Sequence, residues 1–79
     1  MKTIRVQYFD SLEDQRGVTE EAVRTQAQSP EELFKELRAM HRFSVAPSAL
    51  RTSVNNEFVP SNTPLWEGDI VGFTAAPTH

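Results

Sequence analysis

The 79-residue sequence contains no cysteine, only three glycines and no long apolar run. Without cysteine the chain can form no disulfide, no thiolate metal site and no thiol nucleophile. The N-terminal residues alternate and lack the apolar segment of a signal peptide, so we expect a cytoplasmic protein with no membrane partner. The formal net charge of −3, from 8 basic and 11 acidic residues, also disfavours nucleic acid as a partner.

Recognisable catalytic motifs are missing as well. The glycines are too far apart to form a phosphate-binding loop. The only internal histidine, His41, has no acidic residues at metal-ligand spacing, so we expect it to cap a helix or lie at the surface. The acidic pairs at 13–14, 20–21 and 31–32 consist of adjacent residues, which do not face each other, and they read as solvated surface. We therefore expect no cofactor, no metal and no catalysis by the domain alone.

The first part of the chain predicts two strands around a short helix. Alternation over 3–9 indicates a strand, with Phe9 on its polar phase. Residues 10–17 fit one or two helical turns that end at Gly17 in a left-handed conformation. The stretch 19–26 fits either a strand or a weak helix, and a returning hairpin strand is the more economical interpretation.

The clearest local prediction is a helix that begins after Ser29. This serine can cap the helix, Pro30 suits its first position, and Glu32 completes a capping box. Apolar residues then recur at helical spacing and should form the buried face: Leu33, Phe34, Leu37 and Met40.

The remaining segments complete a two-layer α+β domain. A connector at 44–50 leads to short strands at 51–54 and 57–59, and a turn at 66–69 precedes a last strand at 70–73. One helix across a mostly antiparallel sheet of four to five strands is typical of the β-grasp, or ubiquitin-like, architecture. Its first and last strands should lie together at the sheet centre, lined by Ile4, Val6, Tyr8, Ile70 and Phe73. We expect residues 1–74 to form this domain and 75–79 a flexible C-terminal tail.

Three bulky residues do not fit the apolar pattern of the core. Phe9 occupies the polar phase of its strand, Phe58 follows a hairpin turn and Trp66 lies beside a glycine turn. Either these residues patch a thin core, or Phe9 and Phe58, with the end of the last strand near Phe73, form an exposed apolar patch for a protein partner.

Three segments of the chain resemble the small subunit of molybdopterin synthase. Residues 4–12 are similar to its strand-one motif (aromatic, Phe, Ala, any residue, Leu), 54–59 to its Val-Asn hairpin, and 63–73 to its Pro-Leu-x-x-Gly-Asp turn before the last strand. The resemblance implies a β-grasp sulfur carrier of molybdenum cofactor biosynthesis. Its partners would be an adenylating enzyme like those that activate ubiquitin and a large subunit, whose active site receives the carrier's C-terminal tail and supplies the catalytic groups.

The same resemblance implies which residues meet the partner. These are Phe9, Phe58, Phe73, Thr74, Ala75, Ala76 and Pro77, followed by the tail residues Thr78 and His79. The family ends in two glycines where this sequence has Ala-Ala-Pro-Thr-His, and Asp10 stands where the family has alanine. Two interpretations stay open: the natural chain continues past His79 to two glycines, or the protein is a carrier-like interaction module that has lost sulfur transfer.

Overall fold

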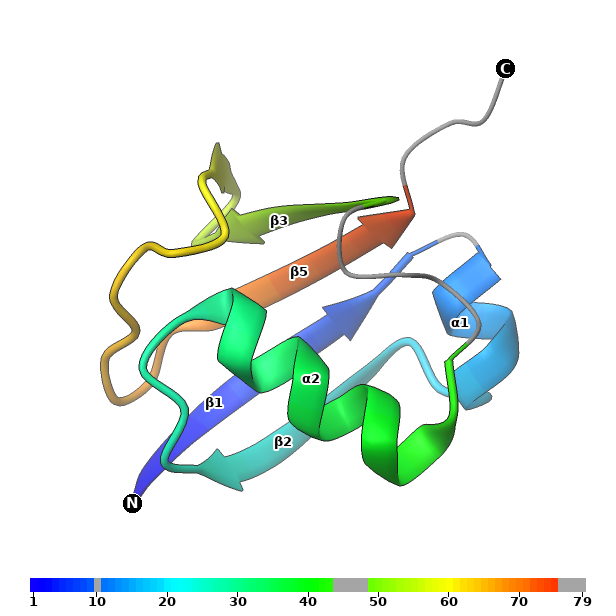
Figure 1. Ribbon diagram of the computed structural model, residues 1–79, viewed down its shortest axis with the longest axis horizontal. Coiled ribbons are helices and arrows are strands. Elements are labelled where there is room, and N and C mark those ends of the chain that lie inside the picture. The colour runs from blue at the N-terminus through cyan, green and yellow to red at the C-terminus, as the bar shows by residue number, and fades with distance from the viewer. Residues whose placement is uncertain (10, 44–48, 76–79) are drawn as a thin grey trace.

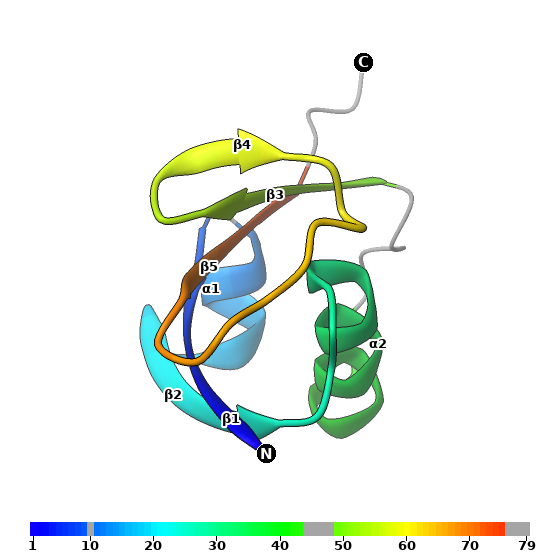
Figure 2. The same cartoon turned by 90° about the vertical axis from the view of Figure 1, so that its left-hand side faces the viewer.

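A single five-stranded sheet organises the computed structural model, which describes residues 1–9, 11–43 and 49–75. The strand order is β2-β1-β5-β3-β4; β1 and β5 are parallel, and the other neighbours are antiparallel. The longer helix covers one side of the sheet (Figures 1 and 2). The elements are β1 (Lys2–Tyr8), α1 (Ser11–Arg16), β2 (Glu20–Thr25), α2 (Pro30–His41), β3 (Leu50–Val54), β4 (Glu57–Val59) and β5 (Ile70–Ala75). The β-grasp prediction is confirmed, and the stretch at 19–26 contains a strand.

The core lies between α2 and the central strands. Parallel pairing sets Val6 opposite Val71 and Tyr8 opposite Phe73, and all four side chains are buried. Ile70, predicted at this centre, is only half-buried. Successive strand residues point to opposite faces, so Ile70 and Phe73 cannot both face the core, and Val71 takes the expected place of Ile70.

The start of α2 follows the prediction, but its buried face is shorter. The Ser29 side chain accepts a hydrogen bond from the Glu32 amide at 3.3 Å, and Leu33, Phe34 and Leu37 are buried. Met40, by contrast, is 69% exposed. The core beside the last turn is filled instead by Phe43, whose ring centroid lies 5.6 Å from that of Tyr8. Arg42, in the left-handed conformation with φ of 56°, redirects the chain toward this position.

Residues in the left-handed conformation form two of the turns, as the sequence predicts for Gly17. Gly17 has a φ of 82° at the end of α1, and Asn55 and Asn56 have φ of 53° and 72° between β3 and β4. These left-handed values are strained for most residues and are tolerated by glycine and asparagine. The short links hold β4 against β3 and α1 against the end of β1.

Several residues that the sequence analysis singles out are not among the described residues. Asp10, the connector residues 44–48 and the tail residues 76–79 lie outside the described residues. Strand β5 continues beyond the predicted 70–73 to Ala75, which pairs with Leu50. No helix in the described part of the chain is both long and apolar enough to cross a membrane.

Candidate partner-binding site

The sheet has one face under α2 and one face that neither α1 nor α2 covers (Figure 2). On the uncovered face, β1 presents Thr3, Arg5 and Gln7, and the chain continues directly into Phe9. Phe9 is 42% exposed and Phe58 is 66% exposed. Large apolar side chains at such exposure are the usual anchors of protein interfaces.

Phe9 is held against the centre of the uncovered face. Its amide donates a hydrogen bond to the carbonyl oxygen of Phe73 at 3.1 Å, which fixes the end of β1 beside β5. A Cβ atom added at Gly72 would lie 3.1 Å from Cε2 of Phe9 and 2.5 Å from Oγ of Ser53. The absent side chain at Gly72 therefore leaves room for the ring to lie directly over the strand.

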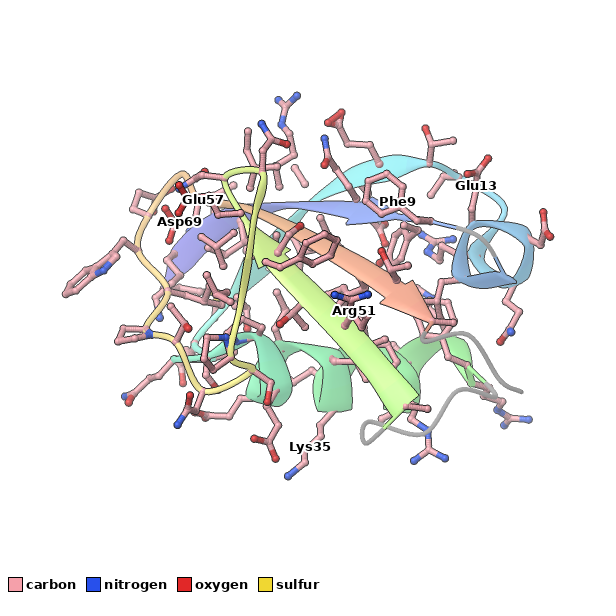
Figure 3. The ribbon with its side chains drawn as sticks, turned by 90° about the horizontal axis from the view of Figure 1, so that it is seen from above. Phe9, Glu13, Lys35, Arg51, Glu57 and Asp69 are labelled. Carbon is pink, nitrogen blue, oxygen red and sulfur yellow. The ribbon has the colours of Figure 1, made fainter. Side chains whose placement is uncertain are left out.

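Phe58 reaches the same face from the outer hairpin. It pairs with Ser53 across β3 and β4, and the Arg51 guanidinium lies 4.7 Å from its ring centroid. This cation–π contact orients an otherwise exposed ring. Figure 3 shows Phe9 and Arg51 on the side of the sheet that faces away from Lys35 of α2. A shallow hollow of about 340 Å³ separates the two aromatic residues; its lining is Phe9, Ser53, Asn56, Phe58 and Thr74. We call these five residues the Phe9–Phe58 face.

The structure brings together some of the predicted partner-binding residues. Phe9, Phe58 and Thr74 share one hollow, and Ala75 is the half-buried last residue of β5 beside it. Phe73 is a correction: its side chain is fully buried, with its ring centroid 5.2 Å from that of Phe34. It precedes outward-facing Thr74 in a strand and must point to the opposite face. Four further predicted residues lie outside the described part of the chain: Ala76, Pro77, Thr78 and His79.

Sequence reasoning missed the residues that complete this face. Arg51, Ser53 and Gly72 come from two strands whose pairing places Ser53 opposite both Phe58 and Gly72. The missing information was the register between β3, β4 and β5. A glycine within a predicted strand beside an out-of-phase aromatic residue was the available signal for Gly72.

A polar cluster at the same end of β1, but on the covered face of the sheet, corrects the interpretation of one acidic pair. Glu21 is half-buried rather than solvated: it accepts hydrogen bonds from the Tyr8 hydroxyl at 2.5 Å and from Arg16 Nη2 at 2.8 Å. His41 Nε2 lies 3.9 Å from the same carboxylate. The hydrogen bonds from Arg16 and Tyr8 lower the pKa of Glu21, whereas burial is the main cause that raises the pKa of Tyr8. The cluster ties α1 and the end of α2 to the sheet.

No group of metal ligands accompanies these features. In the ranges 1–9, 11–43 and 49–75, no three His, Asp or Glu side chains are placed to hold a metal ion. The Phe9–Phe58 face combines exposed aromatic groups with a hollow beside the last described residues of β5. Its chemistry suits recognition of a protein rather than activation of a substrate.

Comparison with known proteins places this geometry in context. No family model and no curated protein matches the sequence. Among solved structures, a protein assigned as molybdopterin converting factor subunit 1 from Pyrococcus furiosus matches with a TM-score of 0.78 and 22% identity, over 98% of this chain and 100% of that one. Small archaeal modifier protein 1 from Haloferax volcanii matches with a TM-score of 0.77 and 13% identity, over 98% of each chain.

A third similar structure contains two subunits. In the complex of subunits 1 and 2 of the molybdopterin-converting factor from Helicobacter pylori 26695, one chain matches with a TM-score of 0.63 and 16% identity, over 98% of this chain and 97% of that one. This protein has the β-grasp fold of these ubiquitin-like proteins. The structural similarity thus confirms the resemblance seen in the sequence at the level of the fold. At these sequence identities it shows the fold alone.

Proposed function

We propose that this protein is a sulfur carrier similar to the small subunit of molybdopterin synthase. It binds a large-subunit-like partner through the Phe9–Phe58 face and presents its C-terminus to that partner's active site. The observation that carries the proposal is the position of β5: Thr74 lines the hollow, and Ala75, the last described residue, follows immediately. Docking on this face would therefore bring the residues after Ala75 to the partner.

The chemistry of a carrier with no cysteine must use the end of the chain. The sequence offers no thiol to hold sulfur, so the terminal carboxylate of the mature chain is the group to be activated. An adenylating enzyme joins a carboxylate oxygen to the α-phosphorus of ATP and releases pyrophosphate. A sulfur donor at the oxidation level of sulfide then displaces AMP and leaves a thiocarboxylate. The partner proteins supply the catalytic groups. The sulfur transfer takes place in the cytoplasm.

The partner assignment is supported by similar proteins. The matched Helicobacter pylori structure is a complex of subunits 1 and 2 of a molybdopterin-converting factor, and its subunits show that a chain of this fold can be one half of a two-protein assembly. The likeness to subunit 1 from Pyrococcus furiosus favours molybdenum cofactor biosynthesis as the pathway. Activation by an adenylating enzyme rests on the sequence resemblance to the carrier family.

Intact-mass spectrometry of the native chain tests the proposal. The full protein is incubated with the adenylating enzyme of its own organism, ATP and a sulfide donor, and a parallel sample omits ATP. We expect the mass increase that replaces one oxygen by sulfur, only when ATP is present. An unchanged mass in both samples would contradict the carrier role.

A binding measurement on a truncated chain, combined with the mass experiment, separates the alternative function. A β-grasp interaction module without sulfur transfer would show no mass change and yet bind the large-subunit-like partner after residues 76–79 are removed. A carrier whose tail enters the partner loses affinity with that truncation. Binding that persists without the tail, together with an unchanged mass, would favour the interaction module.

A further inference from the structure

Three cationic side chains lie along one side of α2, away from the sheet. At about 100° per residue, Lys35, Arg38, Ala39 and Arg42 fall within one arc of roughly 100° on the helix. The opposite arc carries the buried Leu33 and Leu37. Glu31 falls within the same arc one turn before Lys35, so the stripe carries only positive charge from Lys35 toward the C-terminal end of the helix. We call Lys35, Arg38, Ala39 and Arg42 the α2 stripe.

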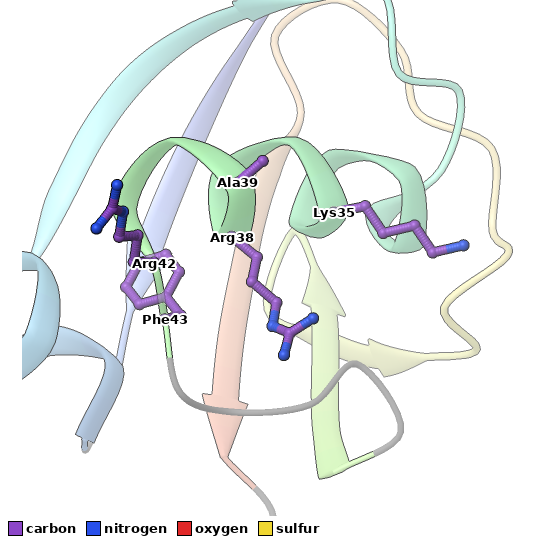
Figure 4. A pocket seen from close by; sticks show the side chains of 5 residues that line it. All are labelled: Lys35, Arg38, Ala39, Arg42 and Phe43. Atoms are coloured by element: carbon purple, nitrogen blue, oxygen red, sulfur yellow. The ribbon is translucent and has the colours of Figure 1, made fainter.

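The stripe surrounds a hollow with an apolar floor. A cavity of about 550 Å³ is lined by the α2 stripe and Phe43 (Figure 4). Phe43 is only 3% exposed, and Ala39 has a short side chain that leaves space between the longer ones. Charged groups at the rim of an apolar floor interact more strongly with an incoming charge than they would in open solvent.

The positive charge of this hollow is poorly compensated. Lys35 lies 3.4 Å from Glu31, and both side chains are well exposed, so this pair is weak. In the described part of the chain, neither Arg38 nor Arg42 forms an ion pair. Glu36, on the same helix, is directed elsewhere, because its carboxylate accepts a hydrogen bond from Thr25 at 2.7 Å.

We propose that the α2 stripe binds an acidic segment, rich in Asp and Glu, of a protein partner. From Lys35 to Arg42 the stripe spans about 10 Å at 1.5 Å per residue. Carboxylates on the same face of an extended segment are two or four residues apart, about 7 or 13 Å at about 3.3 Å per residue, and these spacings bracket the length of the stripe. Arginine can bind carboxylates through two parallel hydrogen bonds. A net charge of −3 and only three clustered cations favour a short acidic segment over nucleic acid.

This second surface is independent of the proposed carrier function. Phe9 lies on the uncovered side of the sheet and Lys35 on the far side of α2 (Figure 3). The sheet and helix layers separate the two surfaces, so one partner can occupy the Phe9–Phe58 face while an acidic segment occupies the α2 stripe. If sulfur transfer is not observed, the α2 stripe can still bind an acidic segment. If the α2 stripe binds no acidic segment, the C-terminus can still carry sulfur.

A titration of the full-length, ¹⁵N-labelled protein with an acetylated heptaglutamate peptide tests the proposal. We expect shifts confined to the amides of residues 35–43 and to the Nε–H groups of Arg38 and Arg42. The double variant Arg38→Gln/Arg42→Gln should weaken binding by about tenfold at low salt, as expected for two exposed charge contacts. The control Arg5→Gln/Arg24→Gln removes the same net charge from the sheet and should change affinity by less than about twofold.

A second variant distinguishes a specific loss of peptide binding from a loss caused by misfolding. Ala39→Glu fills the hollow and adds a negative charge at an exposed helix position, so it should abolish peptide binding while the helical circular dichroism is retained. Equal weakening in the arginine variant and its control would overturn the proposal. Shifts centred on Phe9 and Phe58 would also overturn it, as would tighter binding of duplex DNA or phosphatidylserine vesicles than of the peptide.

Discussion

The two faces of the sheet use aromatic residues in opposite ways. Under α2, Tyr8 and Phe73 are 1% and 0% exposed, whereas on the other face Phe9 and Phe58 are 42% and 66% exposed. The sequence phase within each strand decides which face a residue joins, and residue type does not. An aromatic residue in a small β-grasp domain is therefore a candidate for binding only when its strand phase opposes that of the core.

The largest effect expected from this comparison is on Phe73. Phe73→Ala should lower the free energy of unfolding by about 3–5 kcal/mol, because it leaves a cavity beside Phe34 in a domain with little core to spare. Urea denaturation followed by circular dichroism measures the change. A loss under about 1 kcal/mol would mean that Phe73 does not support the core.

Gly72 connects the two faces and should give the next largest effect. In Gly72→Ala the new methyl group meets Phe9 and Ser53 on the uncovered face, so Phe9 must shift. We expect a loss of about 1–3 kcal/mol in the free energy of unfolding, as is usual for overpacking. The same denaturation experiment measures it.

A matched control locates the origin of that loss. Ser53→Ala removes the closest atom to the new methyl group, so Gly72→Ala/Ser53→Ala should recover part of the stability lost in Gly72→Ala. Additive losses in the double variant would show that the crowding lies elsewhere.

The polar cluster of Tyr8, Arg16 and Glu21 at the end of β1 predicts that part of the free energy of unfolding depends on pH. Glu21 has a lowered pKa in the folded protein, chiefly because Arg16 donates hydrogen bonds to it. Between the folded pKa and the ordinary value of 4.5, the unfolded chain binds more protons, so stability from this group rises with pH. Glu21→Gln should cost about 1–2 kcal/mol at neutral pH, and the difference from the native protein should shrink as the pH falls below that value. Urea denaturation at several pH values tests this, and a pH-independent difference would contradict it.

The covered face was more predictable from sequence than the uncovered one. Alternation located Ile4, Val6 and Tyr8, and the cap at Ser29 located α2, because local patterns and core burial act together there. Helical spacing predicts a buried Met40 and the last strand a buried Ile70, but the position of Phe43 leaves Met40 exposed and the strand phase leaves Ile70 half-buried.

On the uncovered face, sequence could supply candidates but not their arrangement. Phe9 and Phe58 stood out because they break the pattern, yet Arg51 and Gly72 join them only through the register of three strands. The strand pattern places Phe73 at the sheet centre, where it lies, whereas the family resemblance gives it a partner-binding role that does not take the direction of its side chain into account. Long-range register is set by the packing of the whole sheet, which no local pattern encodes.

The smallest stability change is expected for Phe58→Ala. Its ring contacts Arg51 but lies mostly in solvent, so the free energy of unfolding should change by less than about 0.5 kcal/mol. Denaturation of this variant beside Phe73→Ala checks the contrast between the two faces. A loss comparable to that of Phe73→Ala would show that the uncovered face is a structural extension of the core.

The affinity of Phe58→Ala for the large-subunit-like partner of the same organism tests the central claim most directly. Trp66→Ala is the matched control, because Trp66 is 70% exposed but lines a hollow with Lys2 and Gln28 instead. Isothermal titration should show a loss of about tenfold or more for Phe58→Ala, as for an interface anchor, and less than about twofold for Trp66→Ala. Native affinity in Phe58→Ala, or equal losses in both variants, would contradict the assignment of the Phe9–Phe58 face as the docking surface.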